Sequence, residues 1–227
     1  MVRLMDACSE YNRKVLILDR PNPNGHYVDG PILDMKYKSG VGGLPIPIVH
    51  GMTLGELALM VNGESWLPSS RTCDVTVIPC KNYTHQTMYR LPIPPSPNLP
   101  NMKAIYLYPS TCFFEATPVS LGRGTSLPFQ VYGHPNMTGY NYSFTPRSVP
   151  GAKNPPQLNK LCHGVNLSNL SDEDIWKKGV NLTYIIDAYR NLNMGNHFFR
   201  PFFELLIGTD YVRKMIEEGK NADEIKA

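Results

Sequence analysis

The start of the chain shows a helix-like pattern followed directly by a strand-like one. Four apolar residues recur at helical spacing, namely Leu4, Met5, Cys8 and Tyr11. Residues 14–19 then form the run Lys-Val-Leu-Ile-Leu-Asp, which is typical of a buried strand. A helix that leads into such a strand is characteristic of a parallel sheet covered by helices. The pattern therefore predicts an α/β fold.

Capping motifs and apolar runs predict further elements along the chain. Thr53-Leu-Gly-Glu56 has the form of a capping box, which predicts a helix that continues to about Val61. Ser171 is followed by three acidic residues, which suit a helix N-terminus, and a long helix is expected to run to about Leu192. The other expected elements are a strand over 73–79, helix-compatible stretches in 102–114 broken by Pro109, strands over 129–132 and 161–167, and a helix over about 211–218.

The same patterns predict two domains. The Asn-, Pro- and Tyr-rich segment 134–156 is typical of a boundary, so a parallel-sheet domain over residues 1–133 is expected to precede a smaller α+β domain over residues 134–227. Both ends of the chain look cut, because the first helix has no strand before it and a helix-start signature stands three residues before the last residue. The strand at 14–18 is therefore expected to expose an apolar sheet edge, which favours self-association.

Composition narrows the class of protein. The apolar fraction of 42% and the charged fraction of 18% are typical of a globular protein and exclude wholesale disorder. The net charge of +3 is spread along the chain, which argues against nucleic acid and membrane surfaces as partners. No apolar run approaches the ~20 residues of a membrane span, and the first residues do not form a signal peptide.

Metal and cofactor motifs are not found in the sequence. The cysteines form no close CxxC pair and their number is odd, so a zinc site and a disulfide scaffold are both disfavoured and buried, unpaired thiols are expected. Gly40-Val-Gly-Gly43 lacks the third glycine of a dinucleotide fingerprint and does not follow a strand. We therefore expect no metal and no cofactor.

A first group of candidate functional residues follows the first predicted strand. In open α/β sheets ligands bind outside the carboxyl ends of the strands, so Asp19, Arg20 and Asn22 are well placed. The planar guanidinium of Arg20 suits a carboxylate, although Asp19 and Arg20 could instead pair with each other or fix the loop. His50 can transfer protons near neutral pH, but a lone histidine is more often structural. Glu56 is assigned to the capping box.

A second group lies between residues 96 and 125. Its polar members are Ser96, Asn98, Tyr108, Thr111, Glu115, Arg123 and Thr125. The glycines on both sides of Arg123 would let the backbone approach a ligand while the guanidinium is presented to it. Glu115 is the best-placed acid of this group. A salt bridge between Glu115 and Arg123 is the alternative interpretation.

Taken together, these segments are specific for one family. The motifs occur in the order Leu-Asp-Arg-Pro-Asn-Pro (18–23), His-Gly-Met-Thr-Leu-Gly-Glu (50–56), Cys-Asp-Val-Thr-Val-Ile-Pro (73–79), Pro-Ser-Pro-Asn (95–98), Tyr-Pro-Ser-Thr (108–111), Gly-Arg-Gly-Thr (122–125), Cys-His-Gly-Val (162–165) and Leu-Leu-Ile-Gly-Thr-Asp (205–210). With them the chain resembles the bacterial exo-β-N-acetylmuramidases of glycoside hydrolase family 171, long catalogued as a domain of unknown function.

The resemblance implies a fold, an activity and a place in the cell. It implies a partial Rossmann-like N-terminal domain, a smaller C-terminal domain and an active cleft between them. The implied activity is release of terminal N-acetylmuramic acid from peptidoglycan-derived sugars (muropeptides), in the periplasm or cell envelope. Two departures stand out. The glutamate proposed as catalytic lies in a Pro-Glu-His-Gly stretch upstream of Met1 in family members, with no counterpart here, and Val49 stands where the family usually has arginine.

Glycoside hydrolysis needs an acid and a second carboxylate that acts as base or nucleophile. Within this chain Glu115 or Asp19 could supply the second role, or could orient Arg123 and Arg20. Muramic acid differs from glucosamine by a lactyl carboxylate, so an arginine clamp is the expected specificity device. We expect a glycosidase that is inactive as this fragment. The alternatives are a non-catalytic muropeptide-binding protein and a nucleotide-dependent α/β enzyme, which the missing glycine fingerprint disfavours.

Overall fold

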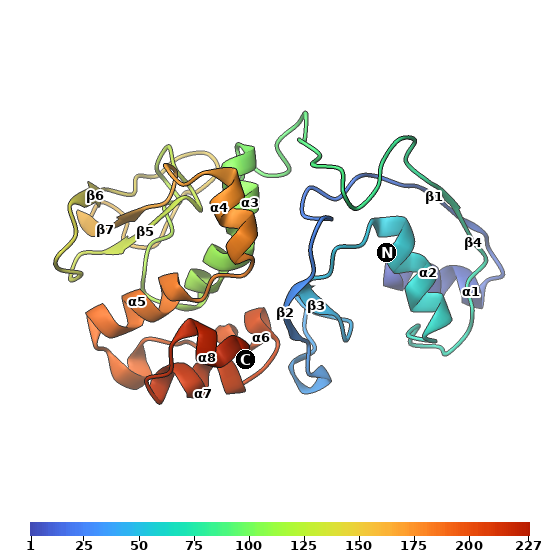
Figure 1. Cartoon of the computed structure of the whole chain (residues 1–227). Coiled ribbons are helices and arrows are strands. Elements are labelled where there is room, and N and C mark those ends of the chain that lie inside the picture. Colours follow the sequence, from blue (N-terminus) through green and yellow to red (C-terminus); the bar gives the residue numbers. More distant parts are fainter. The chain divides into compact units, whose positions relative to one another are not determined.

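The computed structural model describes residues 1–227 and is a mixed α/β structure (Figure 1). The chain forms two compact units, one made of residues 1–28 and 50–90 and the other of residues 29–49 and 91–227. None of the helices is long and apolar enough to cross a membrane. The prediction of an α/β fold is confirmed.

The first unit is built on a two-stranded parallel sheet. Strands β1 (Val15–Leu18) and β4 (Val75–Ile78) pair in register along their whole length. Helices α1 (Val2–Glu10) and α2 (Leu54–Gly63) lie on one side of this pair in Figure 1. These are the helices and strands that the apolar spacing and the capping box predict. A Rossmann-like topology stays a prediction, because two strands do not define it.

Strand β1 has one covered face and one open face. Val15 and Ile17 are buried, whereas Leu16 and Leu18 are 62% and 70% exposed. Ile78, opposite Leu18 on β4, is also exposed. Strands of parallel sheets are usually apolar on both faces because both are covered. The continuous apolar run of β1 therefore leaves an uncovered apolar surface on this unit.

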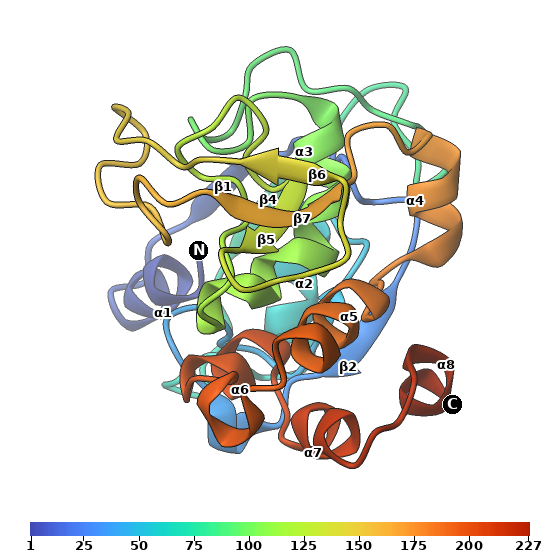
Figure 2. The same cartoon turned by 90° about the vertical axis from the view of Figure 1, so that its left-hand side faces the viewer.

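The second unit contains two antiparallel sheets. Strands β2 (Asp29–Ile32) and β3 (Pro47–Val49) form a pair. A three-stranded sheet has β7 (Cys162–Asn166) in the centre, between β5 (Val131–His134) and β6 (Tyr142–Phe144), as Figure 2 shows. One face of this sheet packs through an apolar cluster of Val131, Phe144 and Cys162.

The remaining elements of the second unit are helical. They are η1 (Met35–Tyr37), α3 (Met102–Thr111), η2 (Cys112–Ala116), α4 (Asp172–Lys178), α5 (Thr183–Leu192), η3 (Gly195–His197), α6 (Phe202–Ile207), α7 (Tyr211–Glu217) and α8 (Ala222–Lys226). Helix α6 packs on η2, where Phe113 and Phe203 are fully buried with ring centroids 6.1 Å apart. Aromatic side chains contribute large buried area and geometric specificity to such a core.

The long helix predicted from Ser171 to Leu192 is wrong, because it is interrupted by Gly179. This glycine has φ +57°, and a Cβ there would stand 2.2 Å from Oδ2 of Asp29. The same oxygen accepts a 2.7 Å hydrogen bond from the Val180 N–H and a 2.9 Å bond from Lys226 Nζ. Between α4 and α5 the helix is therefore interrupted, and the Val180 N–H bonds the partly buried carboxylate of Asp29 instead of a helical carbonyl.

Two further expectations differ from the structure. Pro109 does not break the helix but lies inside α3, near its C-terminal end. The predicted domain boundary after residue 133 falls inside β5, and the supposed boundary segment 134–156 contains β6. Both strands pair with β7, so this segment is tied to the sheet rather than serving as a linker.

The open face of β1 should drive self-association of the 227-residue chain. Replacing Leu16 and Leu18 together by threonine removes apolar surface but keeps a residue type that suits strands. We expect the double variant to stay monomeric in sedimentation velocity at concentrations where the unchanged chain associates. Ile93→Thr changes an equally exposed residue outside the sheet and serves as the control. An unchanged chain that is already monomeric would contradict the expectation.

Candidate functional site

Asp19 stands at the carboxyl end of β1 and anchors the start of α2. Its Oδ2 accepts a 2.6 Å hydrogen bond from the Thr53 hydroxyl, and its Oδ1 accepts one of 2.9 Å from the Gly55 N–H. The Oδ1 atom also accepts from the backbone N–H of Arg20. Asp19 therefore fixes the loop, as one of the two sequence interpretations proposed, and both of its carboxylate oxygens are engaged.

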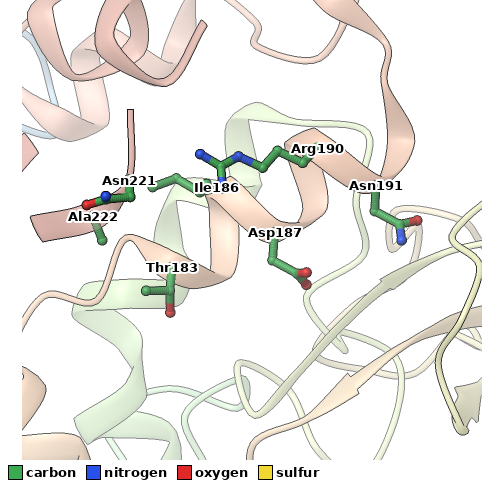
Figure 3. Close-up of a pocket in the computed structure, with 7 residues that line it drawn as sticks. All are labelled: Thr183, Ile186, Asp187, Arg190, Asn191, Asn221 and Ala222. Carbon is green, nitrogen blue, oxygen red and sulfur yellow. The ribbon is translucent and has the colours of Figure 1, made fainter. Parts of the chain in front are cut away.

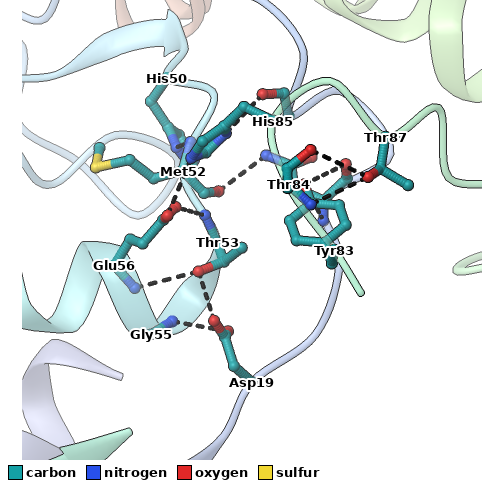
Figure 4. Close-up of polar contacts among 12 residues, drawn as sticks. Asp19, His50, Met52, Thr53, Gly55, Glu56, Tyr83, Thr84, His85 and Thr87 are labelled. Atoms are coloured by element: carbon teal, nitrogen blue, oxygen red, sulfur yellow. Dashed lines mark hydrogen bonds and ion pairs between the residues drawn. The ribbon is translucent and has the colours of Figure 1, made fainter. Parts of the chain in front are cut away.

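Thr53 and Glu56 form the predicted capping box of α2. The Glu56 N–H donates to the Thr53 hydroxyl oxygen, and Glu56 Oε2 accepts from the Thr53 N–H at 2.8 Å. The other carboxylate oxygen, Oε1, lies 3.0 Å from Nε2 of His85 (Figure 4). Nδ1 of His85 lies 2.9 Å from the Gly25 carbonyl oxygen. The capping glutamate thus also holds the loop that follows β4.

Asn22 and His50 are joined through the backbone of Met52. The Asn22 side-chain amide donates to the Met52 carbonyl oxygen at 2.9 Å, and the Met52 N–H donates to His50 Nδ1 at 3.1 Å. His50 Nδ1 is therefore an acceptor, and burial lowers the pKa of His50, which favours the neutral ring. The phenol of Tyr83 accepts from the Asn22 N–H and donates to the Asn22 carbonyl, both at 3.2 Å.

A cavity of about 290 Å³ opens beside these residues in the first unit. Its lining consists of Asp19, Thr53, Glu56, Leu59, Val77, Pro79, Cys80 and Tyr83. Arg20 is exposed, and its guanidinium takes part in no hydrogen bond or ion pair. Arg20 therefore has its full set of donors available to a ligand, whereas the carboxylates that line the cavity are bonded within the unit.

Glu115 and Arg123 form an ion pair in the second unit. Arg123 Nη2 donates to Glu115 Oε1 at 2.8 Å, which is the alternative that the sequence left open. The guanidinium also lies over the ring of Phe129, 5.3 Å from its centroid. Tyr108 packs on the same ring at 5.0 Å. Burial, Cys112 and Glu115 raise the pKa of Tyr108 to about 12, so its hydroxyl stays protonated at neutral pH.

The glycines around Arg123 serve packing within the chain. Gly122 and Gly124 both have φ +81°. A Cβ at Gly122 would stand 2.5 Å from the Leu127 carbonyl oxygen, and one at Gly124 would stand 2.3 Å from the Arg147 carbonyl oxygen. Close approach of backbone to backbone therefore requires glycine at both positions, and the approach of a ligand stays a prediction.

The other candidates of this region make local hydrogen bonds. The buried Thr111 hydroxyl donates to the Leu107 carbonyl, and the Thr125 hydroxyl donates to the Gly122 carbonyl. Ser96 Oγ accepts from the Asn98 N–H, and the Asn98 side chain donates to the Gly151 carbonyl. Thr111 has no exposed surface, so the structure gives it a structural role. Among the candidates of the second unit, Tyr108, Glu115 and Arg123 form one cluster.

Sequence reasoning missed His85 and Tyr83, which follow β4. The strand-end rule that singled out the residues after β1 applies equally after β4 and could have found them. It also missed Asp187, whose Oδ2 accepts the hydroxyls of Tyr132 and Tyr140 at 2.7 and 2.8 Å. Asp187 is one of seven residues that line a cavity of about 460 Å³ in the second unit (Figure 3). No group of three or more His, Cys, Asp and Glu side chains is placed to hold a metal ion.

Comparison with known proteins places the chain in a family. A model of the N-terminal part of the exo-β-N-acetylmuramidase NamZ matches residues 1–103, and a model of its C-terminal part matches residues 106–227. The chain belongs to the NamZ family. The resemblance inferred from the motifs is thereby confirmed. The division between the two family models, at residues 103–106, differs from the division between the compact units, because residues 29–49 and 91–103 belong to the second unit.

Relatives of the NamZ family include a curated enzyme and two crystal structures. The peptidoglycan β-N-acetylmuramidase NamZ of Bacillus subtilis (strain 168) is 35% identical over 243 residues, which cover 99% of this chain and 58% of the relative. A DUF1343 family protein of Bacteroides fragilis NCTC 9343 is 91% identical, with a TM-score of 0.98 over 100% of this chain and 64% of that one.

A second DUF1343 protein of Bacteroides fragilis NCTC 9343, 24% identical, shares the fold with a TM-score of 0.74 over 94% of this chain and 61% of its own. The chain thus spans less than two thirds of the length of each of these relatives.

The packing role of Gly124 is testable against Gly139. Both glycines have φ above +80°, so alanine in this left-handed conformation costs about 1–2 kcal/mol at either site. Only at Gly124 would the added Cβ also meet backbone, since nothing lies within 4 Å of a Cβ at Gly139. We expect Gly124→Ala to lower the free energy of unfolding by about 1–3 kcal/mol more than Gly139→Ala in urea denaturation. Equal losses would show that the Arg147 backbone moves aside freely.

Proposed function

We propose that the chain forms part of a glycoside hydrolase that releases terminal N-acetylmuramic acid from peptidoglycan fragments. The observation that carries the proposal is membership of the NamZ family over nearly the whole chain, together with a relative named as a peptidoglycan β-N-acetylmuramidase. The proposed place of action is the cell envelope, where this substrate occurs. Muropeptides are the proposed partners.

The cluster of Tyr108, Glu115, Arg123 and Phe129 fits a role in recognition of the sugar. Glu115 binds one nitrogen of the guanidinium, Nη2, and Nη1 makes no hydrogen bond. A carboxylate is the acceptor that a planar guanidinium binds best, and the lactyl group of muramic acid supplies one. Tyr108 is partly exposed and protonated at neutral pH, so it offers both a ring surface and a hydroxyl donor.

In this proposal Glu115 orients Arg123, and Arg20 is the second arginine available to the substrate. Glycoside hydrolysis also requires a general acid. The family resemblance assigns that role to the glutamate of a Pro-Glu-His-Gly segment, and no such run occurs in the 227 residues. The 227 residues by themselves are therefore proposed to bind the sugar without hydrolysing it. A non-catalytic muropeptide-binding protein is the second candidate, favoured by the same cluster of binding residues.

Activity assays separate these two candidates. A chromogenic N-acetylmuramide is incubated with the 227-residue chain and with a longer form that carries a Pro-Glu-His-Gly segment upstream. We expect hydrolysis by the longer form alone. Binding of N-acetylmuramic acid by both forms, with hydrolysis by neither, would favour the binding protein. Equal turnover by both forms would contradict the assignment of the acid.

The role of Arg123 is tested by Arg123→Lys, which keeps the charge and loses the bidentate geometry. Loss of a charge-assisted pair is worth about 1.5–3 kcal/mol, so affinity for N-acetylmuramic acid should fall roughly ten- to a hundredfold in calorimetry. Affinity for N-acetylglucosamine, which lacks the lactyl group, should change little. Arg200→Lys, an exposed arginine of the same unit, is the matched control. Equal loss for both sugars, with a lowered melting temperature, would make Arg123 a structural partner of Glu115.

A further inference from the structure

His85 bridges two groups that can only accept hydrogen bonds. Its Nδ1 lies 2.9 Å from the carbonyl oxygen of Gly25, and its Nε2 lies 3.0 Å from Oε1 of Glu56. The other oxygen of the Glu56 carboxylate, Oε2, accepts from the Thr53 N–H. Neutral imidazole carries a single N–H, whereas imidazolium carries two. The geometry therefore requires the doubly protonated ring if both contacts are hydrogen bonds.

The two contacts fix a turn that carries candidate ligand-binding residues. Gly25 closes the turn 22–25, in which its N–H donates to the Asn22 carbonyl at 3.0 Å. Tyr83, from the same loop as His85, bonds both the N–H and the carbonyl of Asn22. A Cβ at Gly25 would stand 2.3 Å from the Tyr83 hydroxyl, so the loop lies tightly against the turn. Asn22 is in this turn, and Arg20 precedes it.

The surroundings of His85 favour the charged ring. The Gly25 carbonyl and the Glu56 carboxylate raise the pKa of His85, and the Gly51 backbone adds to this effect. The ring of Tyr83 is edge-on to His85 at 6.4 Å, and burial raises the Tyr83 pKa, so this neighbour stays neutral. The charged group that faces His85 is therefore Glu56. The His85 side chain is 52% exposed, so solvent protons reach it.

We propose that His85, as imidazolium, is a positioning residue that ties the turn 22–25 to the capping glutamate of α2, and that loss of one proton releases this tie. Because the pKa of folded His85 is raised, the stabilisation is complete below the unfolded value of about 6.5 and is lost as pH rises through the folded value. An effect of this release on sugar binding rests on the proposed function, whereas the contacts of His85 with Gly25 and Glu56 do not.

Nuclear magnetic resonance on the unchanged chain tests the tie directly. Ring nitrogen shifts should show both nitrogens of His85 protonated at pH 6, with a titration midpoint above 6.5. Protection of the Asn22 amide, corrected for intrinsic exchange, should fall by up to about tenfold per pH unit between the unfolded and folded pKa values. The Val15 amide, bonded to the Asp74 carbonyl in the same unit, should keep its protection. A midpoint at or below 6.5, or pH-independent protection of Asn22, would overturn the proposal.

Two variants separate positioning from general stability. Glu56→Gln removes the carboxylate charge and should shift the His85 midpoint back towards 6.5. His85→Arg keeps two donors and a permanent charge, so it should protect the Asn22 amide at every pH and flatten the profile. His197→Gln, at a histidine whose side chain makes no hydrogen bond or ion pair, should leave the profile unchanged. If His85→Arg fails to fold, the titration of Glu56→Gln still decides, because an unshifted midpoint contradicts the role of Glu56.

A binding measurement distinguishes the proposed function from the proposed role of His85. Affinity for N-acetylmuramic acid is measured between pH 6 and pH 8.5 in the unchanged chain and in His85→Arg. A fall in affinity over the range in which His85 titrates, absent from His85→Arg, would support both. If no muramic acid binds at any pH while the His85 titration and Asn22 protection behave as expected, the proposed function fails and the tie stands.

Discussion

A continuous chain of hydrogen bonds organises the first unit, and it starts at the carboxylate of Asp19. From there it passes through Thr53 to the capping Glu56, then through His85 to the Gly25 carbonyl. Each step satisfies a polar group that would otherwise be left unpaired at a strand end, a helix start or a turn. These hydrogen bonds hold the end of β1, the start of α2 and the two strand-end loops in one arrangement, and three of the side chains involved, Asp19, Thr53 and Glu56, also line the cavity.

Local signals were enough to predict the elements of the first unit, because each arises from a few neighbouring residues. The apolar run of β1 and the capping box at Thr53 appear in the structure where the sequence indicated them. In the second unit the prediction of one long helix after Ser171 was wrong, because Asp29, distant in the sequence, accepts the Val180 N–H and lies against Gly179. Local helix propensity carries no information about such a partner.

The sequence could predict the candidate residues that owe their place in the site to a strand end or to a short spacing along the chain. Residues after β1 and the pair of Glu115 and Arg123 were found because strand ends and short spacings bring them together. Whether an acid is structural could not be read from the sequence, since Asp19 becomes an anchor only through Thr53 and Gly55, 34 and 36 residues away. The role of His85 could not be predicted, because it depends on two acceptors, Gly25 and Glu56, that are also far from it in the sequence.

Asp29 also sets an order of events during synthesis of the chain. Its partners Val180 and Lys226 follow it by 151 and 197 residues. At roughly 5–20 residues per second, a ribosome would need on the order of 10–40 s to add the second of them. Until Val180 has been added, Asp29 Oδ2 has neither of these two partners. These contacts of the second unit can therefore form only after residues 50–90 of the first unit have been synthesised.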